Sequence, residues 1–435
     1  MITMNHNNIE DVFPMRDIQK GMVLLSVMRP EEAVYHDQLI YQTPRIDPVL
    51  FEKALALMIE KHATLRTYFD LEKYSMEVQL IAEQISYKVA YEDISHLAAK
   101  AQEQHIKQYI ARERQKPFNF KQAPLWRISI FHVSRTDSVF VFQFHHAIMD
   151  GWSVASFNTE LFQICQQLQN DPTFRPALLK ATYKDAVLEE FAQKKNTATI
   201  DFWKKEMADY KRLDVFTQER MVASFKKSYD VGFAQKLRSR IAADGISLQT
   251  ASFAAFLYAL SRLSIETDLT LGLVSNTRPA IEDGDKILGC FLNTLPFRFQ
   301  MKHPHSWTWR EFFLAVDQKM NVLKKNNQLT LLEITKATEE RPKDENPFFD
   351  ILFNFVDFHI YREINSDAEE APESDALDLE SYEVTNTFVD LTVSTAGGCC
   401  ISITSKTRLC DLASISNVCM LMWIACWNAT SNSHH

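Results

Sequence analysis

The chain carries the stretch HHAIMDG at residues 145–151, and this stretch decides how the rest of the sequence is interpreted. It follows the apolar run VFVFQF at 139–144, which is typical of a strand, and precedes VASFNTEL at 154–161, which has helical spacing. Two histidines therefore stand where a predicted strand ends, followed by a carboxylate and a glycine at the turn into a helix. Because an unperturbed imidazole titrates near neutral pH, a histidine held in this way is suited to proton transfer.

The composition indicates a globular protein with ample core material. The chain has 435 residues, of which 46% are hydrophobic and 24% charged, and at roughly 100–200 residues per domain this length predicts two or more packed units. The formal net charge of -9 argues against a nucleic-acid partner. The seven cysteines are odd in number and irregularly spaced, so we expect reduced thiols in a cytoplasmic protein. The most apolar run, at 418–427, is too short to span a membrane and predicts a buried terminal helix.

Helical and strand-like patterns mix along the whole chain, which predicts an α/β or α+β fold. A break near 170–182, where NDP interrupts the helix after the histidines, suggests two lobes, 1–175 and 176–435. The acidic stretch 363–380 is expected to be a solvated loop. Further helices are predicted at about 50–59, 97–114, 184–194, 200–208, 232–243 and 248–263, and further strands at 126–133, 269–274, 351–355, 388–393 and 400–404.

The positions of the residues in this turn predict different roles for them. Successive side chains of a strand point to opposite faces, so only one of His145 and His146 can face a cleft, and a shared metal is disfavoured. The motif HPH at 303–305 lacks an obvious third ligand, so no metal site is predicted. Asp150 is placed to hold the turn by pairing with an arginine. Gly151 lets backbone approach closely, and its N–H is available to a developing oxyanion.

The pattern H-H-x-x-x-D-G resembles the signature of the condensation domains of nonribosomal peptide synthetases, which are related to chloramphenicol acetyltransferase. Further blocks are similar to motifs of this family and follow in the family's order over nearly the whole chain. Two of them depart from the family pattern, with Lys61 in place of an arginine and Ala186 in place of an aromatic residue. The blocks are PMRDIQKGM at 14–22, KHATLRTYF at 61–69, YKDA at 183–186, LGCFLNTLPFR at 288–298 and NPFFD at 346–350.

The resemblance implies a pair of acetyltransferase-like lobes in a V shape, with an active-site tunnel at their junction. It implies that a donor acyl or peptidyl thioester and an acceptor aminoacyl thioester enter from opposite sides. Each substrate is tethered by the phosphopantetheine arm of a partner, an upstream or a downstream peptidyl carrier protein, and the domain binds no cofactor of its own. An adjacent adenylation domain is a further expected partner, if the chain is part of a multimodular synthetase.

The resemblance also assigns site residues. His146 is the residue carried over as catalytic, acting as a base or as a positioning acceptor for the attacking amine. The position of Gly151 in the turn, rather than the resemblance, adds Gly151 to the catalytic residues. An α-amine with a pKa near 8 needs little help to lose a proton, so the sequence leaves both roles for His146 open. His145 is assigned a structural role.

Asp150 is expected to form a salt bridge. Arg278, in SNTRP at 275–279, is the first choice of partner because it resembles the family's G-R-P turn. Arg66 and Arg298 are the alternatives. Residues expected to line the tunnel are Trp152, Ser153, Asn293 and Thr294.

Other activities remain as alternatives. A free-standing acyltransferase that forms an amide or ester from a soluble thioester is the nearest enzymatic one, and a non-catalytic module that binds carrier proteins is the alternative from another class. The identity of the two substrates, the position in an assembly line and whether the unit is excised or free-standing are not fixed by the motif. No G-x-x-x-x-G-K-S/T or G-x-S-x-G pattern is present, which argues against nucleotide hydrolysis and serine hydrolysis.

Overall fold

The protein is described by a computed structural model that covers residues 9–213, 220–264, 266–301, 307–340, 346–356, 385, 387–395 and 399–407. So far as the residues are described, they form two compact units. The first unit comprises Met1–Glu189, Arg278–Phe291 and Glu363–Thr385, and the second unit comprises Glu190–Thr277, Leu292–Arg362 and Asn386–His435.

These units differ from the predicted lobes 1–175 and 176–435 in two respects. The chain leaves the first unit within helix α5 (Tyr183–Gln193) rather than in the break before it. The segment Arg278–Phe291 packs within the first unit, although it lies far along the chain. The polar contacts described below explain this packing.

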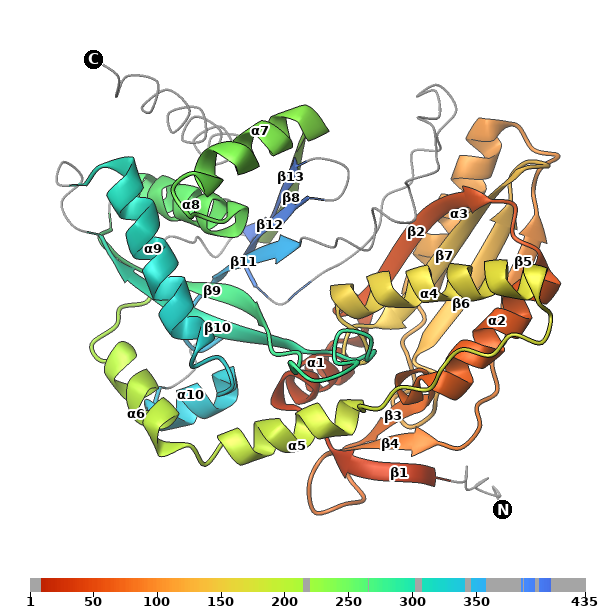
Figure 1. Ribbon diagram of the computed structural model, residues 1–435, viewed down its shortest axis with the longest axis horizontal. Helices are drawn as coiled ribbons and strands as arrows, with labels where there is room; N and C mark the ends of the chain where they lie inside the picture. Colours follow the sequence, from red (N-terminus) through yellow and green to blue (C-terminus); the bar gives the residue numbers. More distant parts are fainter. Residues whose placement is uncertain are drawn as a thin grey trace. The chain divides into compact units, whose positions relative to one another are not determined.

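The first unit contains two sheets and both α-helical and 3-10 segments (Figure 1). A four-stranded sheet has the order β2-β7-β6-β5, and a three-stranded sheet has the order β1-β4-β3. The elements are β1 (Ile9–Pro14), α1 (Asp17–Met28), η1 (Pro30–Glu32), β2 (His36–Pro44), α2 (Pro48–Lys61), η2 (Ala63–Arg66), β3 (Thr67–Asp70), β4 (Val78–Ala82), β5 (Ala90–Asp93), α3 (Ala99–Arg114), β6 (Trp126–His132), β7 (Asp137–His145), α4 (Gly151–Asn170) and α5.

The four-stranded sheet has an apolar face and a partly polar face. Phe140 and Phe142 of β7 pack against Phe51 of α2 and Phe157 of α4, and Figure 1 shows both helices in front of the sheet. On the opposite face, Gln38 of β2 bonds to α3 through the carbonyl of Ile110. Because side chains alternate along a strand, neighbouring residues of β2 and β7 reach different environments.

The second unit is built around a six-stranded mixed sheet with the order β10-β9-β11-β12-β13-β8. Helix α8 supplies Phe253 and Phe256, which pack against Phe353 of β11 in its core. The elements are α6 (Thr197–Glu206), β8 (Arg220–Tyr229), α7 (Val231–Ala242), α8 (Leu248–Ser264), β9 (Asp268–Asn276), β10 (Leu292–Gln300), α9 (Trp309–Lys324), α10 (Leu331–Ala337), β11 (Ile351–Val356), β12 (Val389–Ser394) and β13 (Cys399–Thr407).

The mixed α/β class predicted from the sequence is confirmed, and the predicted helices and strands that lie in the described residues are present within a few residues of their expected bounds. The predictions for 303–305, 363–380 and 418–427 fall outside the described residues. In the described part of the chain, each helix is too short or too polar to cross a membrane. The four cysteines described there are free thiols, namely Cys165, Cys290, Cys399 and Cys400.

Candidate functional site

His145 ends β7 with its ring held inside the first unit. Its Nδ1 accepts a hydrogen bond from the backbone N–H of Ala147 at 3.2 Å, so the ring proton is on Nε2, which lies 2.9 Å from the hydroxyl of Ser26. Phe120 packs edge-on against the ring with centroids 4.7 Å apart. Burial, with the nearby His146 and His36, holds the pKa of His145 well below its usual range. The ring is therefore neutral, and both of its nitrogens are already hydrogen-bonded within the fold.

His146 has a different environment, with a carboxylate as its partner. Its Nδ1 lies 2.5 Å from Oδ2 of Asp37, the second residue of β2. The two side chains meet because Asp37 is paired with Phe144 across the sheet and His146 lies two residues further on, on the same side. A carboxylate accepts the Nδ1 proton, which leaves the lone pair of the neutral ring on Nε2. The sequence analysis missed Asp37; its available signal was an acidic residue two positions before the apolar pair Leu39 and Ile40.

The backbone at His146 is fixed by the turn that leads into β2. The N–H of His146 donates to the carbonyl of Tyr35 at 2.9 Å. Tyr35 has φ of 61°, in the left-handed region that disfavours side chains larger than glycine, and its ring stacks near the His146 ring with centroids 6.4 Å apart. A strained residue therefore supplies both a carbonyl and an aromatic ring to His146.

Asp150 directly precedes α4. It occupies the N-cap position, and its Oδ1 accepts the backbone N–H of Ser153 at 2.8 Å. Its Oδ2 accepts the backbone N–H of Phe291 at 3.0 Å, and its own N–H donates to the carbonyl of Gly289 at 3.0 Å. With only 1% of the residue exposed, the carboxylate joins the start of α4 to the segment Arg278–Phe291.

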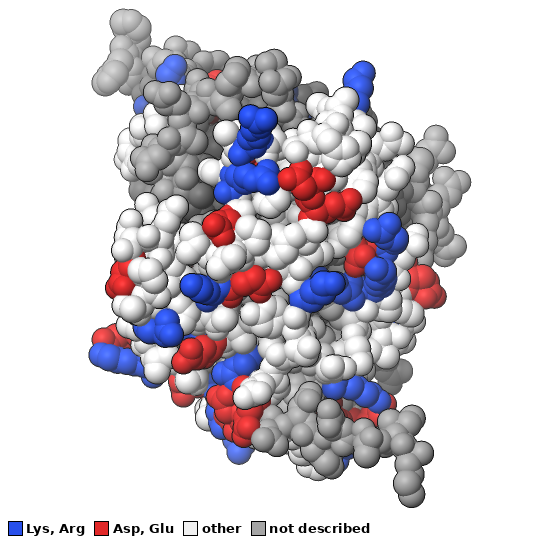
Figure 2. Space-filling view, turned by 90° about the vertical axis from the view of Figure 1, so that its right-hand side faces the viewer, with Lys and Arg blue, Asp and Glu red and all other residues white. Residues whose placement is uncertain are grey.

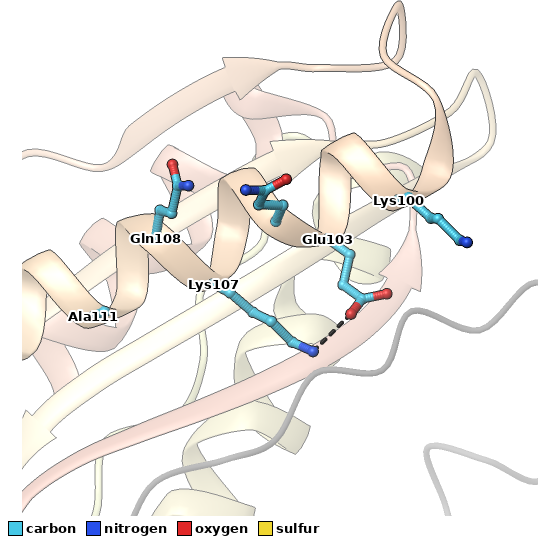
Figure 3. Close-up of a pocket in the computed structure, with 6 residues that line it drawn as sticks. Lys100, Glu103, Lys107, Gln108 and Ala111 are labelled. Atoms are coloured by element: carbon cyan, nitrogen blue, oxygen red, sulfur yellow. Dashed lines mark hydrogen bonds and ion pairs between the residues drawn. The ribbon is translucent and has the colours of Figure 1, made fainter.

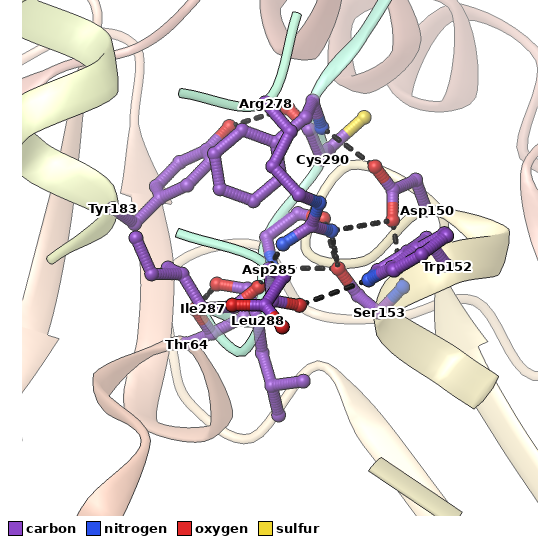
Figure 4. A network of polar contacts seen from close by, with 12 residues as sticks. Thr64, Asp150, Trp152, Ser153, Tyr183, Arg278, Asp285, Ile287, Leu288 and Cys290 are labelled. Carbon is purple, nitrogen blue, oxygen red and sulfur yellow. Dashed lines mark hydrogen bonds and ion pairs between the residues drawn. The ribbon is translucent and has the colours of Figure 1, made fainter. Parts of the chain in front are cut away.

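Arg278 is the arginine that contacts Asp150, with Nη2 at 3.3 Å from Oδ1 (Figure 4). The same Nη2 donates to the hydroxyl of Ser153 at 2.9 Å, and Nη1 donates to the carbonyl of Ile287. The guanidinium lies 4.1 Å from the ring centroid of Phe291. Burial lowers the pKa of Arg278, and the charge of Asp150 opposes that shift.

Ser153 also takes part in these contacts around Asp150 and Arg278, which we call the anchor, and its predicted place along a tunnel stays a prediction. The residue is fully buried, and its hydroxyl donates to the carbonyl of Gly289 at 2.7 Å while accepting the N–H of Gly289 at 3.0 Å. Only glycine fits at position 289, because a Cβ there would overlap the ring of Tyr183. Tyr183 in turn donates its hydroxyl proton to the carbonyl of Cys290 at 2.8 Å.

Arg66 and Arg298, the alternative partners of Asp150, pair elsewhere. Arg66 forms an ion pair with Glu10 and donates to the carbonyls of Ile59 and Ala82. Arg298 of β10 pairs with Asp268 of β9 at 2.6 Å, in the same sheet of the second unit. The acceptors of each guanidinium come from neighbouring elements of its own unit.

The remaining predicted residues are placed as follows. Gly151 is the first residue of α4, and Trp152 follows it with its indole N–H donating to the carbonyl of Asp285 at 2.9 Å. Asn293 in β10 is buried, and its amide donates to two carbonyls of its own unit, whereas the neighbouring Thr294 is half-buried. The roles of these residues toward a substrate remain predictions.

Other surface features of the described residues give no evidence for a second functional site. A shallow depression follows the exposed side of α3, where Lys107 pairs with Glu103 one turn away (Figure 3). On the face shown in Figure 2, Lys and Arg side chains are interspersed with Asp and Glu, unlike the basic stripe of a nucleic-acid-binding protein. No group of three potential metal ligands is found among the described residues.

Comparison with known proteins identifies a family for this arrangement. The family model of the condensation domain matches residues 9–432. The AMB antimetabolite synthetase AmbE of Pseudomonas aeruginosa is 28% identical over 359 residues, which cover 81% of this chain and 16% of that protein. Gramicidin S synthase 2 of Brevibacillus brevis is 24% identical over 351 residues, covering 78% of this chain and 8% of that protein. The chain thus spans a small fraction of the length of these relatives.

Solved structures share the fold. The condensation domain of the monacolin K polyketide synthase MokA superposes with a TM-score of 0.78 and 16% identity, covering 97% of this chain and 99% of that chain. A four-domain nonribosomal peptide synthetase, holo-AB3403, gives a TM-score of 0.75 and 17% identity over 98% of this chain and 34% of that chain.

Proposed function

The chain belongs to the condensation-domain family, whose established role is peptide-bond formation, and from this premise we propose that it joins two substrates held on carrier proteins. The donor is an acyl or peptidyl thioester and the acceptor is an aminoacyl thioester with a free α-amine. The product is an amide that stays bound to the acceptor's carrier protein.

The orientation of His146 is the observation that carries this proposal. Asp37 takes the Nδ1 side of the ring at 2.5 Å, so the neutral ring keeps its lone pair on Nε2. A fixed acceptor of this kind can receive a proton from an attacking amine or orient that amine toward a carbonyl. His145 has both ring nitrogens engaged inside the fold and does not offer such an acceptor.

The proposed reaction is an acyl transfer from sulfur to nitrogen. The acceptor amine attacks the donor carbonyl carbon, a C–N bond forms, and the carbonyl oxygen gains negative charge. When the carbonyl re-forms, the C–S bond breaks and the phosphopantetheine thiolate leaves. One amine proton passes to Nε2 of His146 and then to the departing sulfur, so the protein returns to its starting protonation state.

The start of α4 is suited to the charge that develops on the oxygen. Gly151 is the first residue of this 20-residue helix, whose N-terminal end carries the positive end of the helix dipole. The Asp150 carboxylate is directed to Ser153, Phe291 and Arg278, so the anchor holds the helix start in place. We assign Gly151 as the donor to the oxyanion on this basis.

The partners that this reaction needs are two peptidyl carrier proteins with phosphopantetheine arms, one on the donor and one on the acceptor side. The relatives AmbE and gramicidin S synthase 2 are much longer chains named as synthetases, and holo-AB3403 is a four-domain synthetase. These names support an assembly in which carrier domains and an adenylation domain adjoin this unit.

A condensation assay tests the proposal. Donor and acceptor carrier proteins are loaded separately, mixed with the protein, and analysed by mass spectrometry for transfer of the acyl group to the acceptor amine. We expect product with the wild type, and a rate about 10²–10⁴-fold lower with His146→Ala. His105→Ala, which changes a half-exposed histidine on α3, is the matched control and should keep the wild-type rate.

Other outcomes separate the alternative functions. Transfer from a soluble thioester at the same rate as from a carrier would indicate a free-standing acyltransferase. Carrier binding without product in any donor–acceptor pair would indicate a non-catalytic binding module. An unchanged turnover in His146→Ala would reject the role given to this residue.

A further inference from the structure

We propose that Asp37 is a positioning residue for the reaction, which holds His146 in the Nδ1-protonated form and stabilises its ring as the ring takes up a proton on Nε2. This inference rests on the proposed function, because it assigns a partner to the residue that receives the proton.

The geometry of the contact between Asp37 and His146 supports this role. Asp37 and His146 are 109 positions apart in the chain, yet Oδ2 and Nδ1 approach to 2.5 Å. The side chains are 4% and 10% exposed, so little water can compete for the bond. The antiparallel register of β2 and β7 fixes the position of Asp37, and the bond from the His146 N–H to the Tyr35 carbonyl fixes the backbone of His146.

The charge balance around Asp37 supports the same role. Within the described residues, Oδ1 of this buried carboxylate has no hydrogen-bond partner, so Asp37 is directed to His146 through Oδ2 alone. A carboxylate that serves only to stabilise a fold is usually saturated with donors, as Asp150 is. The attraction between the Asp37 carboxylate and its partner ring increases when the ring becomes positive, which is the change expected in the transition state.

Neither His36 nor His145 can replace Asp37 as an acidic partner of the His146 ring. Burial and the charge of Arg127 lower the pKa of His36 to about 4, and the pKa of His145 is also held low, so both rings are neutral at pH 7. The titratable side chains identified around His146 are therefore Tyr35 from the turn before β2, Asp37 from β2 and His145 from β7. Of these, Asp37 is the acidic group that contacts the His146 ring.

Two substitutions test the inference in the condensation assay. Asp37→Leu removes the acceptor and is expected to lower kcat by about 10²-fold while the KM for the acceptor substrate changes little, since the lost interaction belongs to the transition state. Asp37→Asn keeps a neutral acceptor of the same size, is expected to fold, and should lower kcat by about tenfold. Asp70→Asn, which neutralises another buried carboxylate in the same unit, is the matched control and should keep the wild-type kcat.

A spectroscopic readout separates this inference from the proposed function. Protein with ¹⁵N-labelled histidine reports which ring nitrogen carries the proton, and the His146 signals are assigned by their loss in His146→Ala. We expect an Nδ1-protonated ring in the wild type and a redistribution toward Nε2–H in Asp37→Leu.

Two results would overturn the role of Asp37: an Nε2-protonated His146 in the wild type, or a kcat in Asp37→Asn equal to that of Asp70→Asn. A wild type that forms no product would reject the proposed function instead. The NMR measurement would still decide whether Asp37 sets the form of the ring.

Discussion

Replacing Arg278 with methionine should destabilise the first unit by about 3 kcal/mol. The substitution removes the ion pair with Asp150 and the bonds to Ser153 and Ile287, while an apolar side chain can still cover Phe291. Removing one partner of a buried pair costs about 3–5 kcal/mol. We expect the lower end of that range because Asp150 keeps the backbone N–H groups of Ser153 and Phe291 as donors.

A double-mutant cycle isolates the interaction itself. In Asp150→Asn the side-chain oxygen can still cap α4, but the amide group then meets the N–H of Phe291, donor against donor, and the buried Arg278 loses the charge of the carboxylate that it contacts. Both single variants should therefore be strongly destabilised. The double variant Asp150→Asn/Arg278→Met has no unpaired charge and should lose about 1–3 kcal/mol less than the sum of the single losses.

Urea unfolding followed by circular dichroism measures these free energies. Lys107→Met is the control, because it breaks an exposed ion pair one turn apart on α3 and should change stability by no more than about 0.5 kcal/mol. A loss below about 1 kcal/mol in Arg278→Met, or strictly additive losses in the cycle, would show that the anchor is not held by this ion pair.

Two further variants probe the surroundings of the site. Gly289→Ala should lower stability by about 1–3 kcal/mol in urea unfolding, because its Cβ would overlap the Tyr183 ring, and the double variant with Tyr183→Leu should recover part of the loss; no recovery would contradict this explanation. The pKa of His36 is lowered from 6.5 in the unfolded chain to about 4 in the folded protein. Between these pH values the unfolded state therefore binds more protons than the folded state. The contribution of His36 to stability is complete above pH 6.5 and is lost as the pH falls toward 4. Between pH 7 and pH 5 the wild type should lose about 2 kcal/mol more than His36→Asn, and parallel pH profiles would refute this assignment.

The sequence predicted a large part of the candidate site. His145, His146 and Asp150 occur in one short segment, so local spacing alone placed them at the end of a strand and the start of a helix. The similarity of Arg278 to a family turn also selected the arginine that contacts Asp150. Physical reasoning from the sequence could not choose Arg278 over Arg66 and Arg298, because the three arginines have the same chemistry.

Asp37 shows why part of the site was missed. Strand β2 begins with His36, Asp37 and Gln38, all buried, and a run of polar residues hides the alternation that identifies a strand. These residues are tolerated because α3 and β7 provide them with partners, as the bonds of Gln38 to Ile110 and Gln143 illustrate.

The sequence by itself determined the class of fold, the family and the strand–turn–helix segment that carries the histidines. Those features follow from residue periodicity and from motifs that are contiguous in the chain. Only the tertiary structure decided that Asp37 contacts Nδ1 of His146 and that the segment Arg278–Phe291 is anchored on Asp150. Both depend on strand register and on packing between residues more than a hundred positions apart, and local propensity carries no information about either.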